Sequence, residues 1–335
     1  MKRFKDYTEE ISEKEYRSSE RASYSFFKRL LEVGPSVIRD GMPKISTKYL
    51  TLGSIVDKMI TEEGYKPEDE YVISDINVDL SNSTHHSKIL AYIKDWEYKE
   101  ISDVQLKMIC SDLGFKRSPN IEDESFRRQL EVVLRANNGE NIISSVEFNL
   151  AQKMVDSLKN HEYTKEIFSL EKDFEDIEII PQAKIFFKMH GVECKSMLDW
   201  LIVNHSKKVI TPIDLKTGSF FDFMKNFYKY KYFLQGAMYH ASIQSIVVKN
   251  EEFKDYKVDG FKFVYISREK PELPLIYNMD NNEIEKAFKG WTHNSGAYQK
   301  GIEDLVLDYS WYKENSEFDL DRKIVENLGV TNIKL

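Results

Sequence analysis

The sequence predicts an α/β protein in which a mostly helical first half precedes a β-rich core. Apolar residues recur at helical spacing up to about residue 170, and runs rich in Ile, Val, Leu and Phe follow from about residue 175. The chain has 335 residues, of which 41% are hydrophobic, so it can bury a sizeable core. We expect a helical part at residues 1–170 and a core at residues 171–335, integrated into one domain.

Five segments of the first half have the periodicity of helices. Residues 20–34 carry apolar side chains on one side and end at Gly34-Pro35, a helix stop signal. The other four expected helices cover residues 49–61, 87–114, 124–137 and 144–170. The first half therefore supplies helices that pack around the core.

The second half predicts strands interrupted by one long helix. Three β-rich runs, DIEIIPQAKIFFKMHG, CKSMLDWLIVN and KKVITPIDLKT, are separated by short polar breaks and predict a meander. A helix is expected at about residues 221–248, followed by strands in FKFVYISREK and LPLIYNMD and a surface helix at residues 281–305. This order of elements predicts an α/β core.

Composition excludes several classes of protein. No apolar run approaches the roughly 20 residues that a membrane span needs, and the charged N-terminus lacks a signal peptide's apolar stretch. We expect a cytoplasmic protein with no membrane partner. Cys110 and Cys194 are the two cysteines, too few for a four-cysteine zinc or iron–sulfur site. The net charge of −8 disfavours diffuse electrostatic binding of nucleic acid, although a local basic face remains possible.

Two isolated acids and a lysine carry the strongest chemical signal. Asp199 and Asp214 are fifteen positions apart, enough for one strand to end, turn and return beside itself, so both carboxylates can converge. Lys216 shares a strand face with Asp214 because side chains alternate with a period of two. An isolated Asp-x-Lys is usually an exposed strand end, so the prediction depends on the combination.

Hard oxygen ligands of this kind suit Mg²⁺ or Mn²⁺. We expect Asp199, Asp214 and the backbone carbonyl of Leu215 to hold the metal, with Lys216 orienting a water or stabilising developing charge. Gln235 and Tyr239 share a helix face four residues apart and can brace the lysine or a DNA phosphate. The combination predicts a metal-dependent nuclease that hydrolyses phosphodiester bonds.

A basic and aromatic segment, FFDFMKNFYKYKYF, precedes Gln235. Its Phe residues at helical spacing predict core positions. Lys225, Lys229 and Lys231, with Tyr228 or Tyr230, are candidates to follow a DNA strand by charge and stacking.

In these motifs the chain resembles the PD-(D/E)xK nuclease superfamily, in particular the RecB-like exonucleases and the exonuclease VIII (RecE) type of bacteriophages and prophages. The matched residues are Cys194, Lys195 and Asp199 in a Cys-Lys-x-x-x-Asp stretch, Asp214, Lys216 and Thr217 in Asp-x-Lys-Thr, and Tyr232, Gln235 and Tyr239 in a helix motif. The resemblance covers roughly residues 20–310, discontinuously. It implies a restriction-endonuclease-like core with a mixed β-sheet flanked by helices.

The resemblance adds residues to the expected site. Asp57 stands where the family usually has a metal-ligating His, and a carboxylate there still suits Mg²⁺ or Mn²⁺. Lys195 and Tyr232 become candidate DNA contacts. The implied activity is digestion of linear double-stranded DNA from its ends, in the cytoplasm of a bacterial or phage-infected cell. The implied partners are a single-strand annealing protein and further copies of the chain in a ring.

Two alternatives remain open. A RecB-like nuclease of the CRISPR-associated or helicase-linked kind often needs an iron–sulfur cluster or an ATP-binding phosphate loop, and the sequence offers neither four cysteines nor that loop. We therefore expect no iron–sulfur cluster and no ATP. A catalytically inactive DNA-binding or assembly protein is favoured by the acidic charge and by Asp57, but retention of Asp199, Asp214 and Lys216 argues against it.

Overall fold

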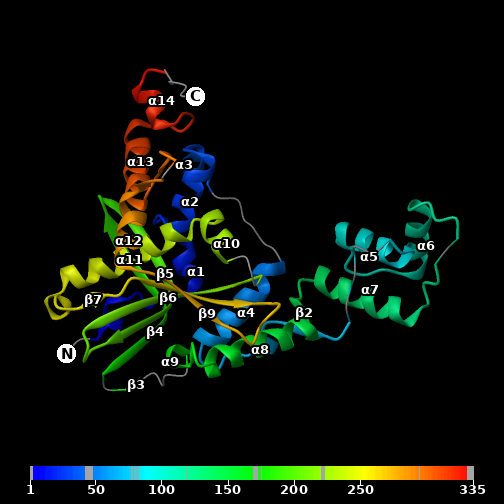
Figure 1. Ribbon diagram of the computed structural model, residues 1–335. Coiled ribbons are helices and arrows are strands. Elements are labelled where there is room, and N and C mark those ends of the chain that lie inside the picture. The colour runs from blue at the N-terminus through cyan, green and yellow to red at the C-terminus, as the bar shows by residue number, and fades with distance from the viewer. Residues whose placement is uncertain are drawn as a thin grey trace. The chain divides into compact units, whose positions relative to one another are not determined.

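The computed structural model describes residues 3–41, 48–76, 78, 80, 83–117, 119–168, 173–174, 176–219, 223–293 and 295–329 (Figure 1). The chain divides into two compact units. Unit 1 comprises Met1–Gly53, Ile60–Glu62 and Met154–Leu335, and unit 2 comprises Ser54–Met59 and Glu63–Lys153. None of the described helices is both long and apolar enough for a membrane crossing.

Unit 1 is built on a mixed, seven-stranded sheet. The order is β3-β4-β5-β6-β8-β9, with β7 also paired to β6. Strands β3 to β6 are antiparallel neighbours, β6 pairs in parallel with β7 and β8, and β8 and β9 are antiparallel. The strands are β3 (Asp173–Phe174), β4 (Ile177–Met189), β5 (Val192–Asn204), β6 (Val209–Gly218), β7 (Lys257–Val258), β8 (Phe261–Ser267) and β9 (Leu275–Met279). The expected meander and the two later strands are confirmed.

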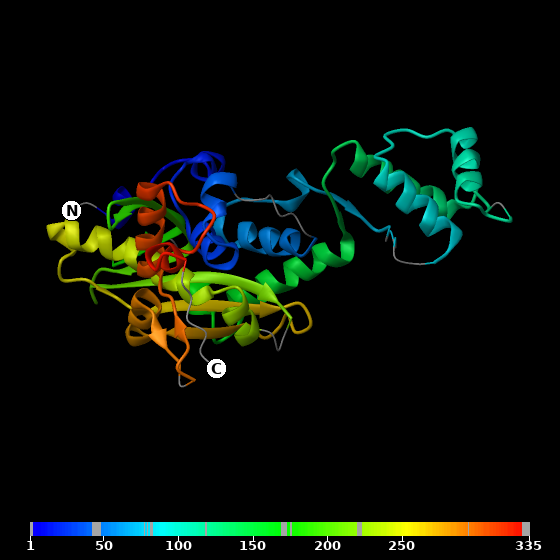
Figure 2. The same ribbon diagram turned by 90° about the horizontal axis from the view of Figure 1, so that it is seen from above.

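The helices of unit 1 surround this sheet, and α11 lies across it (Figures 1 and 2). They are η1 (Phe4–Tyr7), α1 (Glu13–Ser18), α2 (Tyr24–Val33), α3 (Ser36–Asp40), α9 (Lys165–Phe168), α10 (Phe223–Lys229), α11 (Tyr232–Lys249), η3 (Glu251–Phe253), α12 (Asn281–Lys289), α13 (Ile302–Asn315) and α14 (Arg322–Glu326). Gly236 permits the close approach of α11, because a Cβ there would lie 3.2 Å from Met279 Sδ and 3.4 Å from Phe261. The residues beside Gly236 are thereby held against the sheet.

The prediction of a single helix at residues 221–248 is wrong. The chain forms α10 and α11 with a break at Tyr230 and Lys231, while residues 221–222 lie outside the described residues. Lys231 has a left-handed backbone with φ of 58°, which no α-helix continues through. The Tyr24 hydroxyl on α2 donates to the Tyr230 carbonyl at this break. A contact from a distant helix therefore accompanies the break.

The expected surface helix at residues 281–305 is also divided. Helix α12 ends at Lys289 and is capped by Gly290, whose φ of 85° suits glycine and whose N–H donates a hydrogen bond to the Lys286 carbonyl. A short hairpin of β10 (Trp291–Thr292) and β11 (Tyr298–Gln299) follows, and α13 begins only at Ile302. The hairpin presents side chains that a continuous helix would have placed elsewhere.

Unit 2 is a small helical unit with its own core. Helices α5 (His85–Asp95), α6 (Asp103–Asp112) and α7 (Glu124–Asn137) enclose buried residues that include Leu90, Leu106 and Phe126. The helix expected at residues 87–114 is two helices, because Ser102 and Gln105 form a capping box that starts α6. The remaining elements are η2 (Pro67–Asp69) and the parallel pair β1 (Val72–Ser74) and β2 (Ile142–Ser144), while α4 (Lys48–Thr61) and α8 (Ser145–Asn160) each run through both units. The last two residues of the helix expected at 144–170 lie outside the described residues.

A buried carboxylate ties the start of unit 1 to its sheet. Glu178 on β4 is 3% exposed and accepts hydrogen bonds from the backbone N–H groups of Phe4 at 2.9 Å and Lys5 at 2.8 Å. His205 Nε2 lies 3.2 Å from the same carboxylate. The cluster satisfies a charge that would otherwise be costly to bury.

Candidate active site

The register of β5 and β6 places Asp199 directly opposite Asp214. The last ladder pair between these strands is Trp200 with Ile213, so the two aspartates are the next residues in register, just beyond the end of the ladder. Side chains of opposed residues on antiparallel strands point to the same face. The sequence prediction that a strand, a turn and a return bring these acids together agrees with this register.

A backbone hydrogen bond fixes the geometry where the two strands separate. The Leu215 N–H donates to Asp199 Oδ2 at 2.8 Å, in place of a ladder bond to β5. The N–H and the carbonyl of one residue in an extended strand point to the same edge, so the Leu215 carbonyl faces the side of β6 that carries Asp199. The Leu215 carbonyl therefore faces the Asp199 side, as a backbone metal ligand would need to.

Lys216 joins the same group of side chains. Its ammonium forms an ion pair with Asp214 Oδ2 and lies 4.8 Å from the centroid of the Tyr232 ring. Burial acts to lower the pKa of Lys216, but the negative charges of Asp214 and Asp199 outweigh it and raise the pKa above its ordinary value. The lysine is therefore a fixed positive charge beside two carboxylates at neutral pH.

Helix α11 contributes Gln235 and Tyr239, which project toward the sheet. Gln235 is 5% exposed, and its Nε2 donates to Asp214 Oδ1 at 2.6 Å. Its side chain also lies beside the Tyr239 hydroxyl and lowers the pKa of that tyrosine, although burial raises the pKa well above its usual value. Tyr239 thus stays a neutral hydroxyl near both aspartates. Gln235 therefore positions the Asp214 carboxylate from the side of the sheet that α11 covers.

Burial and neighbouring charges have opposite effects on the pKa of Asp214. This residue is 2% exposed, and burial raises its pKa above the ordinary value despite the opposing effects of Lys216, Gln235 and the neighbouring Asp199. Ionising both carboxylates beside one ammonium leaves a net negative charge in a poorly solvated place. That arrangement favours a cation.

The donors fit a hard divalent metal. Among the described residues no cluster of three or more His, Cys, Asp or Glu side chains is arranged to hold a metal. Mg²⁺, however, is usually held by one or two carboxylates, with waters and substrate phosphates completing the octahedron. Gln235 Oε1 is also buried with no hydrogen-bond partner among the described residues, so it can accept a bond from a water at the site. Asp199, Asp214 and the Leu215 carbonyl therefore match the chemistry of Mg²⁺ or Mn²⁺.

Asp57 lies on α4 in the part assigned to unit 2 and is half-buried. One turn earlier on this helix, Gly53 belongs to unit 1 and packs on β6, since a Cβ at Gly53 would lie 2.9 Å from Thr217 Oγ1. Thr217 directly follows the catalytic lysine candidate. Metal ligation by Asp57 stays a prediction.

The prediction that Lys195 contacts DNA is contradicted by the surroundings of its side chain. It is 7% exposed, and its ammonium donates to the carbonyls of Tyr16 at 2.8 Å, Arg17 at 3.2 Å and Ser19 at 2.7 Å. These carbonyls lie at the C-terminal end of α1, where a cation is favourable. Because its three donors are engaged inside the protein, Lys195 anchors α1 rather than presenting charge to DNA.

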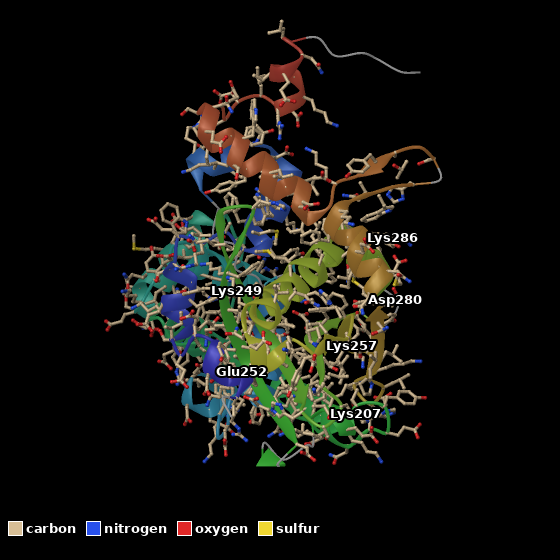
Figure 3. All side chains as sticks on the ribbon, turned by 90° about the vertical axis from the view of Figure 1, so that its left-hand side faces the viewer. Lys207, Lys249, Glu252, Lys257, Asp280 and Lys286 are labelled. Atoms are coloured by element: carbon tan, nitrogen blue, oxygen red, sulfur yellow. The ribbon has the colours of Figure 1, made fainter. Side chains whose placement is uncertain are left out.

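The other candidate DNA contacts lie on or after α10. Lys225 and Lys229 are exposed, and Lys231 is half-buried at the break before α11. The half-buried ring of Tyr232 packs between the Lys216 ammonium and Phe263. By contrast, Lys207 occupies the turn between β5 and β6, and the strand ends at this turn lie five residues, or about 17 Å, from the aspartates. Figure 3 shows Lys207 well below Lys286 of α12.

Two features of this face were not predicted from the sequence. Aromatic residues alternate along β8 as Phe261, Phe263 and Tyr265, and the register pairs Phe263 with Asp214. The alternation lies on the strand beside Asp-x-Lys in the sheet, and it is a sequence signal that could have been found. Gln182 on β4 lies opposite Asp199 in register with φ of 47°, a local irregularity for which only the Pro181-Gln182 dipeptide gave a hint.

Comparison with solved structures gives only distant similarity. A protein from Eubacterium rectale, named as a candidate exonuclease, is 13% identical, with 98% of this chain and 96% of that chain covered and a TM-score of 0.47. Protein VC1899 from Vibrio cholerae is 14% identical over 81% of this chain and 58% of that chain, with a TM-score of 0.16. No curated protein matches the sequence.

A family model gives the assignment. It matches residues 23–304, which include β4 to β9, α11 and the Asp199, Asp214 and Lys216 group. The mixed sheet flanked by helices agrees with a restriction-endonuclease-like fold. The chain belongs to the family described as "PDDEXK-like domain of unknown function (DUF3799)".

Proposed function

We propose that this protein is a metal-dependent deoxyribonuclease that acts as an exonuclease on linear double-stranded DNA. Membership of a PD-(D/E)xK-like family supports a nuclease. The observation that carries the proposal is the register of β5 and β6, which sets Asp199 opposite Asp214 with Lys216 on the same face. A merely structural ion pair would not need a second carboxylate beside it.

The residues divide the work of phosphodiester hydrolysis. Asp199, Asp214 and the Leu215 carbonyl would hold Mg²⁺ or Mn²⁺, with Asp57 as a further proposed ligand. When bound, the metal lowers the pKa of a water and offsets charge on the phosphate. Lys216 orients the attacking water or stabilises the charge that develops on the phosphate oxygens. Gln235 keeps the Asp214 carboxylate in place through its 2.6 Å hydrogen bond. Tyr239 packs beside Gln235 and supports it in this position.

The finer parts of the proposal concern substrate and partners. Resemblance to the exonuclease VIII type supports digestion from duplex ends in phage recombination or DNA processing in the cytoplasm. It also supports a single-strand annealing partner and a homo-oligomeric ring. The exposed Lys225 and Lys229 supply positive charge on α10 that DNA binding would use, despite the net charge of −8.

The test is incubation of linear and covalently closed circular duplex DNA with Mg²⁺ or Mn²⁺, with Asp214→Ala as the inactive control. We expect the wild type to degrade linear DNA and spare circles. Cleavage of closed circles would replace the exonuclease with an endonuclease. A wild type that is inert with both metals but binds DNA would instead support the non-catalytic alternative.

A further inference from the structure

A cavity lined by aromatic side chains lies beside the candidate active site. We call it the aromatic groove; its volume is about 310 Å³, and its lining includes Met224, Phe227, Tyr228, Phe263, Tyr277 and Trp291. This volume is at the lower end of the range for small-molecule sites. Phe263 is fully buried and forms part of the floor, whereas Met224 and Tyr228 are 49% and 52% exposed.

Strand register shows that the groove and the candidate active site share one face of the sheet. Asp214 pairs with Phe263 on β8, and Phe263 pairs with Tyr277 on β9, so these three side chains point the same way. Tyr232 stands at the boundary: its ring is 4.8 Å from the Lys216 ammonium and 5.9 Å from Phe263, nearly parallel to it. One aromatic layer therefore separates the lysine from the groove.

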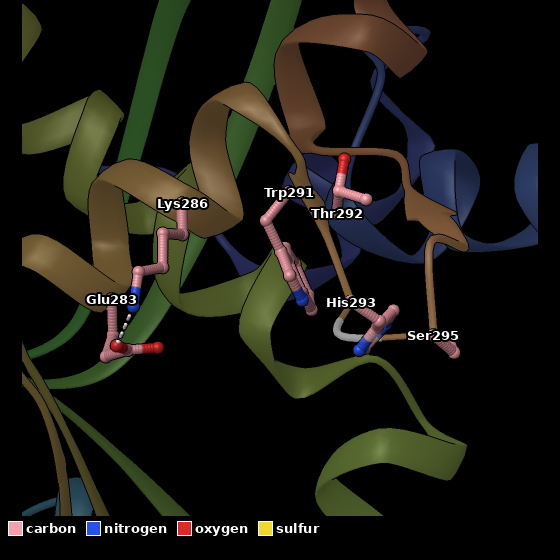
Figure 4. A pocket seen from close by; sticks show the side chains of 6 residues that line it. All are labelled: Glu283, Lys286, Trp291, Thr292, His293 and Ser295. Carbon is pink, nitrogen blue, oxygen red and sulfur yellow. Dashed lines mark hydrogen bonds and ion pairs between the residues drawn. The ribbon is translucent and has the colours of Figure 1, made fainter.

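The edge of the groove is polar. Asn278, Glu283, Lys286 and His293 also line it. Figure 4 shows Lys286 paired with Glu283, and Trp291 and His293 on the hairpin that follows α12. On α10, Lys225 and Lys229 directly follow the lining residues Met224 and Tyr228. Neither lysine forms an ion pair with any described residue.

We propose that the aromatic groove binds an unpaired nucleobase of the DNA strand that is cut. A base needs flat apolar surfaces for stacking, and its phosphates need cations beside them. The groove offers the first through its aromatic lining, and the exposed Lys225 and Lys229 on α10, a helix that contributes to that lining, supply the second. The inference rests on the proposed function, because the groove's position next to Lys216 places the base close to the scissile phosphate.

The experiment measures base stacking without cleavage. The probe is a linear duplex with one unpaired 2-aminopurine nucleotide at its end and an abasic neighbour, mixed with the full-length protein in EDTA. Stacking in the groove quenches the fluorescence. The test variant is Met224→Ser/Tyr228→Ser, which changes exposed side chains, and the matched control is Tyr163→Ser, a tyrosine that is 53% exposed elsewhere in unit 1.

We expect quenching by the wild type and the control, and a dissociation constant raised roughly 5- to 150-fold in the double variant, because stacking of a base contributes about 1–3 kcal/mol. Equal quenching by all three proteins, or none by the wild type, would overturn the inference. Self-association that is lost only in the double variant, measured by sedimentation velocity, would assign the groove to a second copy instead.

Cleavage of linear duplex with Mn²⁺ is measured in parallel. Quenching that depends on the groove without any cleavage contradicts the nuclease and leaves a nucleobase site. Cleavage without groove-dependent quenching contradicts only the nucleobase site.

Discussion

One sheet face of unit 1 has two halves of opposite chemistry. On β5 and β6 it presents Asp199, Asp214 and Lys216, whereas on β8 and β9 it presents Phe263 and Tyr277. The polar half holds charges in fixed geometry and can act on a phosphate. The aromatic half has no chemistry of its own but can hold a flat ring. We therefore expect substitutions in the polar half to lower the rate of DNA cleavage, and substitutions beside the aromatic half to lower the affinity for DNA.

The largest expected effect comes from Asp214→Asn, which removes the charge of a proposed metal ligand but keeps the shape of the side chain. We expect the cleavage rate with Mn²⁺ to fall on the order of 10³-fold or more, while DNA binding changes little. Asp255→Asn is the matched control, since Asp255 is exposed and pairs with Lys208 near the turn end of the strands. A rate within tenfold of the wild type would remove Asp214 from the mechanism.

Lys216→Gln should separate catalysis from metal binding. The substitution removes the positive charge beside Asp214 but no oxygen ligand, so kcat should fall about 10²- to 10³-fold at saturating Mn²⁺. Calorimetry should find Mn²⁺ affinity changed far less. If the whole loss lies in metal affinity, the lysine only balances charge.

Gln235→Leu tests positioning from α11. It deletes the 2.6 Å hydrogen bond to Asp214 and keeps the buried volume similar. Outer-shell partners of metal-ligating groups usually contribute 10- to 100-fold to affinity or activity, so we expect a loss of about that size. Recovery of activity at high Mn²⁺ would show that Gln235 acts through the metal site. Unchanged activity at all Mn²⁺ concentrations would leave Gln235 a packing residue.

The smallest effect is expected from Lys225→Ala/Lys229→Ala, on the helix that borders the aromatic half. DNA affinity should fall, and the slope of log K against log salt should decrease in magnitude by about 2, with kcat at saturating DNA little changed. Lys207→Ala/Lys257→Ala removes the same charge from exposed positions near the turn end of the strands (Figure 3). Equal effects of both pairs would mean that DNA does not prefer the α10 side.

The strands and their register could be predicted because local rules determine them. Alternation with a period of two fixes the shared face of Asp214 and Lys216. The fifteen-residue spacing from Asp199, centred on a short polar break, fixes the pairing. Both signals lie within about twenty residues of sequence.

Other features depend on partners far away in the chain. Nothing in the YKYKYF stretch predicts a left-handed Lys231, where a hydroxyl from α2 bonds the preceding carbonyl. Lys195 belongs to a motif, but its ammonium is bound by carbonyls of α1 nearly 180 residues earlier. The groove likewise needs α10, β9 and the hairpin together. Sequence patterns cannot predict contacts that only the assembled tertiary structure creates.

The Glu178 cluster has a consequence for the order of folding. Phe4 and Lys5 are separated from their carboxylate partner by 174 and 173 residues, and His205 lies still further along the chain. During synthesis, residues 4 and 5 cannot gain these bonds until the first long strand of the meander has left the ribosome. Contacts of such high sequence separation form slowly. The N-terminal segment should therefore be among the last parts of unit 1 to acquire protection against hydrogen exchange during refolding.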